Sequence, residues 1–152
     1  MCLLASIGTL VEVWPRLSIE ESSYLDPSNP FTELFKVENN GYIPAVNVIA
    51  DCPSANFDIP GKLHVGNNFM GAGIKIAYYL AHGDKVTLFC SELMSHAIYE
   101  RERGAVASGA TLTIGVGYAL WHLDYKLLRQ SQTFTFRSIV GSDGSQHWMF
   151  VQ

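Results

Sequence analysis

The sequence predicts an all-β domain: an antiparallel β-sandwich of about seven to eight strands, with at most one short helix. Several short runs alternate apolar and polar residues with a period of two, which is the pattern of strands that face a core on one side. Clusters of Gly, Pro, Asn and Asp separate these runs, as turns require. The runs do not alternate with helical segments, so a nucleotide-binding α/β fold is disfavoured.

The first predicted strand covers residues 17–24. A compact turn at 26–30 follows, because its two prolines fix φ and its Asp and Asn side chains can bond the local backbone. The second strand covers 31–38, and the residues on its inner face are Phe31, Phe35 and Val37.

A tight reversal is predicted after this strand, at Asn39-Asn40-Gly41, because these residue types tolerate positive φ. The third strand resumes the alternation and ends at Cys52, and its predicted inner face consists of Val46, Val48, Ala50 and Cys52. The stretch from Pro30 to Cys52 therefore predicts strand, tight turn, strand.

The middle of the chain is less regular between Pro53 and Gly73, where prolines and glycines predict a loop, a short strand at 62–65 and a second loop. A strand at 74–80, a turn at 81–84 and a strand at 85–90 follow. The inner face of that last strand consists of Val86, Leu88 and Cys90.

Residues 91–103 are the one segment with helical spacing; Ser91 could cap that helix and Gly104 could end it. The strand at 110–118 has two glycines, Gly115 and Gly117, on its outer face, a pattern that marks a bulge or a close backbone approach. A terminal hairpin joins 133–139 to 146–151 through a turn that contains Asp143-Gly144. The predicted core is Phe35, Val37, Val46, Val48, Val86, Leu88, Leu112, Ile114, Val116, Phe134 and Trp148.

Length and composition indicate one globular domain with its own core, since the 152 residues are 48% hydrophobic and only 16% charged. The net charge is −4 and no cluster of Lys and Arg occurs, so we expect no nucleic-acid partner.

The N-terminal segment, residues 1–16, is apolar and precedes the predicted domain at 17–152. Its run at 3–11 is shorter than the roughly 20 residues that span a bilayer. Trp14 and Arg16 after an apolar run are typical of a membrane interface. Three interpretations remain: the remnant of a membrane anchor, which we favour, a marginal anchor, or an element packed on the core. We therefore expect a membrane-anchored or extracytoplasmic protein.

Two of the three cysteines, Cys52 and Cys90, each end a predicted strand on its inner face, and Cys2 lies in the N-terminal segment. They could be free buried side chains, or they could pair in an oxidising compartment. A disulfide between Cys52 and Cys90 requires Cα atoms within about 7 Å. Such a bond would support an extracytoplasmic location of the domain.

Catalytic chemistry has little support in the sequence. None of the familiar spacings of a metal site occurs among the five histidines. They are His64, His82, His96, His122 and His147. Cys90 could act as a nucleophile together with a histidine and an Asp such as Asp84 or Asp124, but its inner position opposes the exposure that a reactive thiol needs. No Gly-x-Ser-x-Gly or phosphate-binding loop occurs. We therefore predict no catalytic, cofactor-binding or metal residue, and no enzyme.

Five aromatic residues could form a carbohydrate or peptide surface, but we interpret them as filling the core and its ends: Tyr78, Tyr79, Trp121, Tyr125 and Trp148. Tyr42, next to the Asn-Asn-Gly turn, is predicted to be exposed.

The turn motifs resemble those of bacterial immunoglobulin-like domains of the CARDB and adhesion type. The residues that carry the resemblance are Asp26-Pro-Ser-Asn-Pro-Phe, Phe35-Lys-Val-Glu-Asn-Asn-Gly-Tyr-Ile-Pro and Gly83-Asp84 before Val86-Thr-Leu. The resemblance also covers the strand at 110–118, and it extends to uncharacterised bacterial proteins with one N-terminal membrane helix. The resemblance implies an immunoglobulin-like sandwich and no catalytic residue.

Two hypotheses for function follow. The first is a non-enzymatic immunoglobulin-like domain, anchored or exported, that mediates adhesion or contact with a protein partner. The alternative is a small ligand-binding or hydrolytic β protein with a pocket near residues 53–73.

Overall fold

The computed structural model describes residues 14–24, 33–58, 65–68, 73–90, 109–120, 129–140, 142 and 146–151. Within those ranges all regular secondary structure is β, and the predicted helix at 91–103 lies outside them. The strands are β1 (Leu17–Tyr24), β2 (Glu33–Asn39), β3 (Ala45–Asp58), β4 (Val65–Asn68), β5 (Ile74–Leu80), β6 (Lys85–Phe89), β7 (Gly109–Leu120), β8 (Arg129–Val140) and β9 (Gln146–Phe150).

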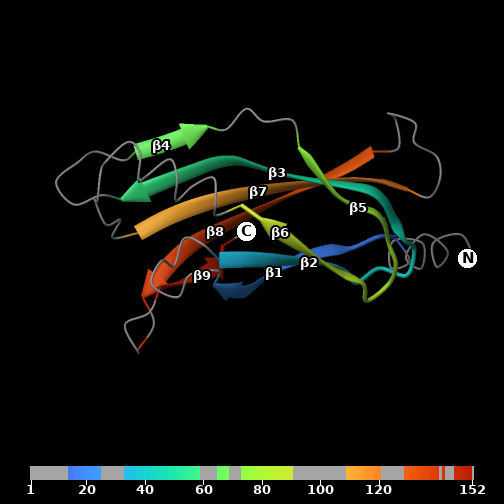
Figure 1. Cartoon of the computed structure of the whole chain (residues 1–152), viewed down its shortest axis with the longest axis horizontal. Helices are drawn as coiled ribbons and strands as arrows, with labels where there is room; N and C mark the ends of the chain where they lie inside the picture. The colour runs from blue at the N-terminus through green and yellow to red at the C-terminus, as the bar shows by residue number, and fades with distance from the viewer. Residues whose placement is uncertain are drawn as a thin grey trace, which may run out of the picture.

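Two antiparallel sheets form the sandwich, which confirms the predicted fold class (Figure 1). The small sheet has the order β1-β2-β6, and the large sheet has the order β4-β3-β7-β8-β9, with β5 also paired to β3. Because β7 pairs along the whole of β3, both β4 and β5 must occupy the other edge of β3. The terminal hairpin is present as β8 and β9.

The core lies between the sheets and contains most of the residues predicted for it. Phe35 of β2 is at its centre, with ring centroids 5.0 Å from Phe136 and 6.3 Å from Trp148 on the opposite sheet. Val86 and Phe134 are partly buried against this cluster. The other predicted residues in it are Val37, Val48, Leu88, Leu112, Ile114 and Val116.

Val46 is an exception, because a bulge in β3 separates it from the face of Val48. The pairing of β3 with β7 passes from Val46–Ala119 directly to Ile49–Gly117, and Asn47 has a φ of +50°. An extra residue in one strand shifts its alternation relative to the partner strand. Val46 is buried, but it lies outside the main core cluster.

The irregular middle segment also differs from the prediction. β3 does not stop at Cys52 but continues through Pro53 to Asp58, with a second register shift between Asp51 and Ser54. A proline lacks the N–H that a ladder needs, so a bulge is where a strand can accommodate one. The short strand of this segment begins at Val65 and runs to Asn68, later than the predicted 62–65.

The turn after β2 crosses between the two sheets and does not form a hairpin. β2 belongs to the small sheet and β3 to the large one, so the two strands are not paired. Positive φ occurs elsewhere among the described residues, at Asn47 and Gly83, and not at Asn39-Asn40-Gly41. A side chain, rather than a left-handed backbone, therefore organises this crossing.

That side chain is Asn39, which is completely buried. Its Oδ1 accepts hydrogen bonds from the backbone N–H groups of Arg16 (3.2 Å) and Gly41 (3.0 Å). Its Nδ2 donates to the carbonyl oxygens of Ile43 (3.0 Å) and Leu80 (2.9 Å). One amide thus joins the N-terminal segment, the crossing turn and the end of β5.

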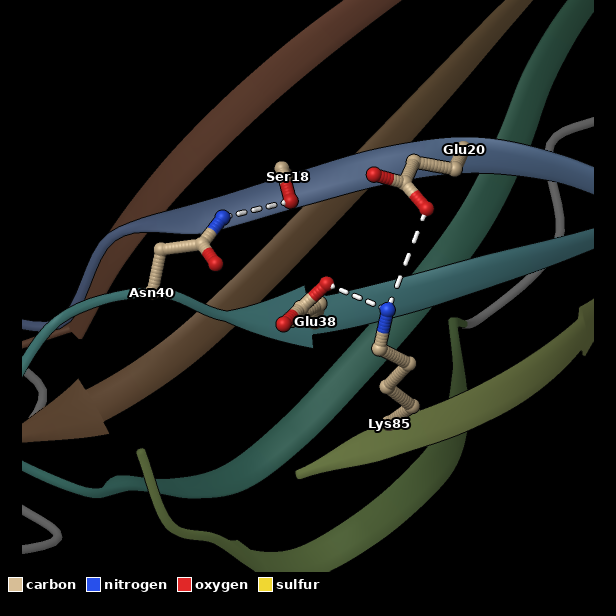
Figure 2. Close-up of polar contacts among 5 residues, drawn as sticks. All are labelled: Ser18, Glu20, Glu38, Asn40 and Lys85. Carbon is tan, nitrogen blue, oxygen red and sulfur yellow. Dashed lines mark hydrogen bonds and ion pairs between the residues drawn. The ribbon is translucent and has the colours of Figure 1, made fainter. Parts of the chain in front are cut away.

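The outer face of the small sheet carries a cluster of polar side chains (Figure 2). Lys85 of β6 places its Nζ 2.8 Å from Glu38 on β2 and 3.9 Å from Glu20 on β1. The hydrogen bond to Glu38 is the main cause that raises the pKa of Lys85. Asn40 donates to the Ser18 hydroxyl at 2.8 Å beside this cluster. Exposed ion pairs contribute little to stability, so this face is a solvated surface.

The N-terminal segment meets the domain before β1 begins. Pro15 is buried, and the Tyr118 hydroxyl donates to its carbonyl oxygen at 3.2 Å. Residues 1–13, which carry the candidate anchor, lie outside the described ranges. Among the described residues, no helix is long and apolar enough to cross a membrane.

Tyr118 should make the stability of the domain fall at alkaline pH. Burial raises the pKa of its phenol, so the folded state favours the neutral form. This contribution is complete below the unfolded pKa of about 10 and is lost as pH rises through the folded pKa. Tyr118→Phe should cost about 1 kcal/mol at neutral pH from the lost hydrogen bond. It should also reduce the alkaline loss.

Urea unfolding at neutral pH and above the normal tyrosine pKa would measure both effects. Tyr42→Phe is the matched control, because Tyr42 is 71% exposed. The same pH dependence in wild type and Tyr118→Phe would contradict this prediction.

Candidate functional site

A groove of 410 Å³ lies on the outer face of the large sheet, over β7. The backbone of Gly115 and Gly117 forms its floor. One wall comes from β3 and the other from β8, and the wall residues are Asn47, Ile49, Asp51, Pro53, Arg129, Ser131 and Thr133.

The register of the three strands explains why the groove forms here. Gly117 lies between Ile49 and Ser131, so the middle strand contributes no side chain at that level. Gly115 lies in the same way between Asp51 and Thr133. Neighbouring strands lie about 4.8 Å apart, so the two walls stand roughly 10 Å from each other. The paired glycines were the signal for this feature in the sequence, but the wall residues were not predicted.

The carboxylate of Asp51 extends over the groove floor. A Cβ atom added at Gly115 would overlap Asp51 Oδ1. At Gly117 the nearest atoms to such a Cβ are the carbonyl oxygens of Gln130 and Ile49, at 3.7 and 4.0 Å. The absence of a side chain therefore gives Asp51 its place at one end and leaves open floor at the other.

An exposed aromatic ring on β5 is linked through Lys75 to Asn47 of the β3 wall. Lys75 of β5 donates from Nζ to Asn47 Oδ1 at 3.1 Å, and the same ammonium lies 4.4 Å from the ring centroid of Tyr78. Tyr78 is 76% exposed. The cation–π contact joins Tyr78 to Lys75, and neither residue lines the groove.

The candidate disulfide pair lies together in the structure. Cys52 and Cys90 are joined by a disulfide with a Cα–Cα distance of 5.9 Å. Cys52 lies in β3 of the large sheet and Cys90 directly follows β6 of the small sheet, so the bond connects the two sheets. Because the bond uses both sulfurs, Cys90 has no thiol to act as a nucleophile.

The described histidines occupy separate positions. His82 is exposed, its ring stacks on Tyr42 at 4.9 Å, and its Nδ1 lies 3.2 Å from the Gly41 carbonyl. His147 contacts Glu21 at 3.2 Å, across from β9 to β1. Among the described residues, no group of three or more His, Cys, Asp or Glu could hold a metal. The remaining histidines, His64, His96 and His122, lie outside those residues.

The aromatic residues only partly follow the interpretation as core. Trp148 is buried and Tyr42 is exposed, as predicted. Tyr78 and Tyr79 were interpreted as core, but they are 76% and 55% exposed, so both faces of β5 are open to solvent at this point of the sheet edge. Trp121 and Tyr125 lie outside the described residues.

Asp84, considered as a catalytic partner of Cys90, has a structural role. Its Oδ2 accepts the backbone N–H of Ala81 at 2.9 Å and closes the turn between β5 and β6. The positive φ of Gly83, +78°, completes that turn. Asp124, the other candidate partner, lies outside the described residues.

Comparison with protein-family models finds no matching family, and comparison with curated proteins finds no match. The disulfide, the exposed edge of β5 and the groove are therefore the features of this molecule that bear on its function.

Proposed function

We propose that this chain is a non-enzymatic, immunoglobulin-like domain of a membrane-anchored or exported bacterial protein, and that it acts by contacting another protein. The observation that supports a contact role is the exposed edge strand β5. It pairs with β3 on one side, and no described strand pairs with its other side. Three of its large side chains are exposed: Ile74 (61%), Tyr78 (76%) and Tyr79 (55%).

An edge strand of this kind can accept a strand from a partner protein. No described strand occupies its outer N–H and C=O groups, and exposed aromatic side chains add specific contact area. Sheet edges are usually protected by several charges or by proline. Lys75 is the only charged residue in β5. The edge is therefore weakly protected against pairing.

The disulfide supports the proposed location. Structural disulfides persist in oxidising compartments and are rare where thiols are kept reduced. The bond joins a half-buried Cys52 to a fully buried Cys90, as a structural bond does. The resemblance to anchored bacterial domains supports the same location.

Photocrosslinking in the producing bacterium tests the contact role. A photoreactive phenylalanine analogue replaces Ile74 at the β5 edge, and the matched control carries it at exposed Thr87 on the small sheet. We expect a discrete protein adduct from position 74 that excess purified domain competes away. No adduct from position 74, or the same adducts from both positions, would refute the proposal.

A further inference from the structure

We propose that the groove over β7 binds a neutral carbohydrate, with a sugar ring lying on the open floor at Gly117, beside the Asp51 carboxylate. This goes beyond the protein contact proposed above, because it concerns the outer face of the large sheet and not the β5 edge.

The shape of the groove fits a ring rather than a long peptide. The walls stand roughly 10 Å apart, and the floor is open at Gly117, where the Asp51 carboxylate does not cover it. At 410 Å³ the groove lies in the range of small-molecule sites, about 300–1,000 Å³. Glycine in the floor lets a flat ligand approach the backbone closely.

The wall chemistry fits a ligand with many hydroxyl groups. Asp51 supplies carboxylate oxygens that accept hydrogen bonds, while Ser131 and Thr133 on the facing strand can both donate and accept. Asn47 already accepts from Lys75 through Oδ1, so its remaining contribution is an N–H donor. Vicinal hydroxyls of a sugar, each both donor and acceptor, match such a mixed set.

The charge of the walls favours a neutral ligand. They carry one acidic residue, Asp51, and one basic residue, Arg129. The register places them at opposite corners, because Asp51 pairs with Gly115 whereas Arg129 pairs with Ala119. A phosphate or sulfate group would need clustered donors without a carboxylate beside them. In the groove, the carboxylate of Asp51 lies on the floor and the one basic side chain, Arg129, is at the opposite corner.

NMR titration of the ¹⁵N-labelled domain tests this inference. The probes are glucose, galactose, mannose, N-acetylglucosamine, cellobiose and chitobiose at millimolar concentration, with inorganic phosphate as the anionic comparison. We expect at least one sugar to shift the Gly115 and Gly117 amides saturably, and phosphate to leave them unchanged. The inference is overturned if none of these sugars shifts both amides, if the shifts map elsewhere, or if phosphate produces the same shifts.

Variants then show whether binding uses the groove. Gly115→Val fills the floor and displaces the Asp51 carboxylate, and should weaken binding at least about tenfold, or 1.4 kcal/mol. Thr111→Val, on the same face of β7 but outside the groove, should bind as wild type does. Asp51→Asn keeps the shape of the groove and should also weaken sugar binding. If Gly115→Val does not fold, the binding measured for Asp51→Asn tests the inference alone. Unchanged binding in Asp51→Asn and in folded Gly115→Val would overturn the inference, and crosslinking at Ile74 tests the protein contact separately.

Discussion

Replacing Cys52 and Cys90 together by alanine should lower the free energy of unfolding by about 4 kcal/mol. The bond closes a loop across a sequence separation of 38 residues, so its loss restores much conformational freedom to the unfolded chain. It also removes the covalent connection between the two sheets. Single domains of this size are stable by about 5–15 kcal/mol, so the variant should retain a small margin or unfold near physiological temperature.

Urea unfolding of the oxidised wild type, the reduced wild type and the double variant measures this effect. The two proteins without the bond should unfold at similarly low urea concentration. Cys2→Ala, which leaves the bond intact, is the control and should behave as wild type does. Thiol titration of protein purified without reductant gives a second readout: one thiol per denatured chain before reduction and three afterwards, since the chain has three cysteines. Three thiols before reduction would contradict the prediction.

The sequence predicted the core well because the signal for a strand face is local. In β7, Leu112, Ile114 and Val116 alternate with small or polar residues, and a strand with that pattern has one way to bury its apolar side. The same alternation placed Cys52 and Cys90 on inner faces, but it left open whether they are free or paired, and the structure joins them.

Bulges and sheet assignment could not be predicted in this way. The left-handed Asn47 and the continuation of β3 through Pro53 depend on the strands that pair with β3 on both edges. Whether β2 pairs with β3 or faces it across the core is also a tertiary property, which a turn motif does not determine.

The groove shows the same limit. The sequence marked Gly115 and Gly117 as unusual on the outer face of a strand, but a groove also needs side chains on both sides. Asp51 and Thr133 are separated by about half of the chain, and only the register of β3, β7 and β8 places them at the same level. The tyrosines of β5 were misinterpreted for a related reason, since an edge position is not visible in the alternation of a strand.

Asn39 is the clearest case of a residue whose role depends on tertiary structure. In the sequence it is one of three turn formers, whereas in the structure it is the buried residue with four hydrogen bonds to backbone groups. Two of these partners, Arg16 and Leu80, lie 23 and 41 residues away in the chain. The amide is suited to this position because it offers both an acceptor and two donors.

Asn39→Ala should therefore lower the free energy of unfolding by about 3–5 kcal/mol, because it leaves two carbonyl oxygens and two N–H groups without their partner. Asn39→Asp should be at least as damaging, since it keeps the shape but turns a charged oxygen toward the carbonyls of Ile43 and Leu80. Asn40→Ala is the matched control: Asn40 is exposed, its side chain bonds only the exposed Ser18 hydroxyl, and its loss should cost no more than about 0.5 kcal/mol. Urea unfolding of the three variants measures these differences. Equal losses in Asn39→Ala and Asn40→Ala would mean that the buried amide does not hold the crossing between the sheets.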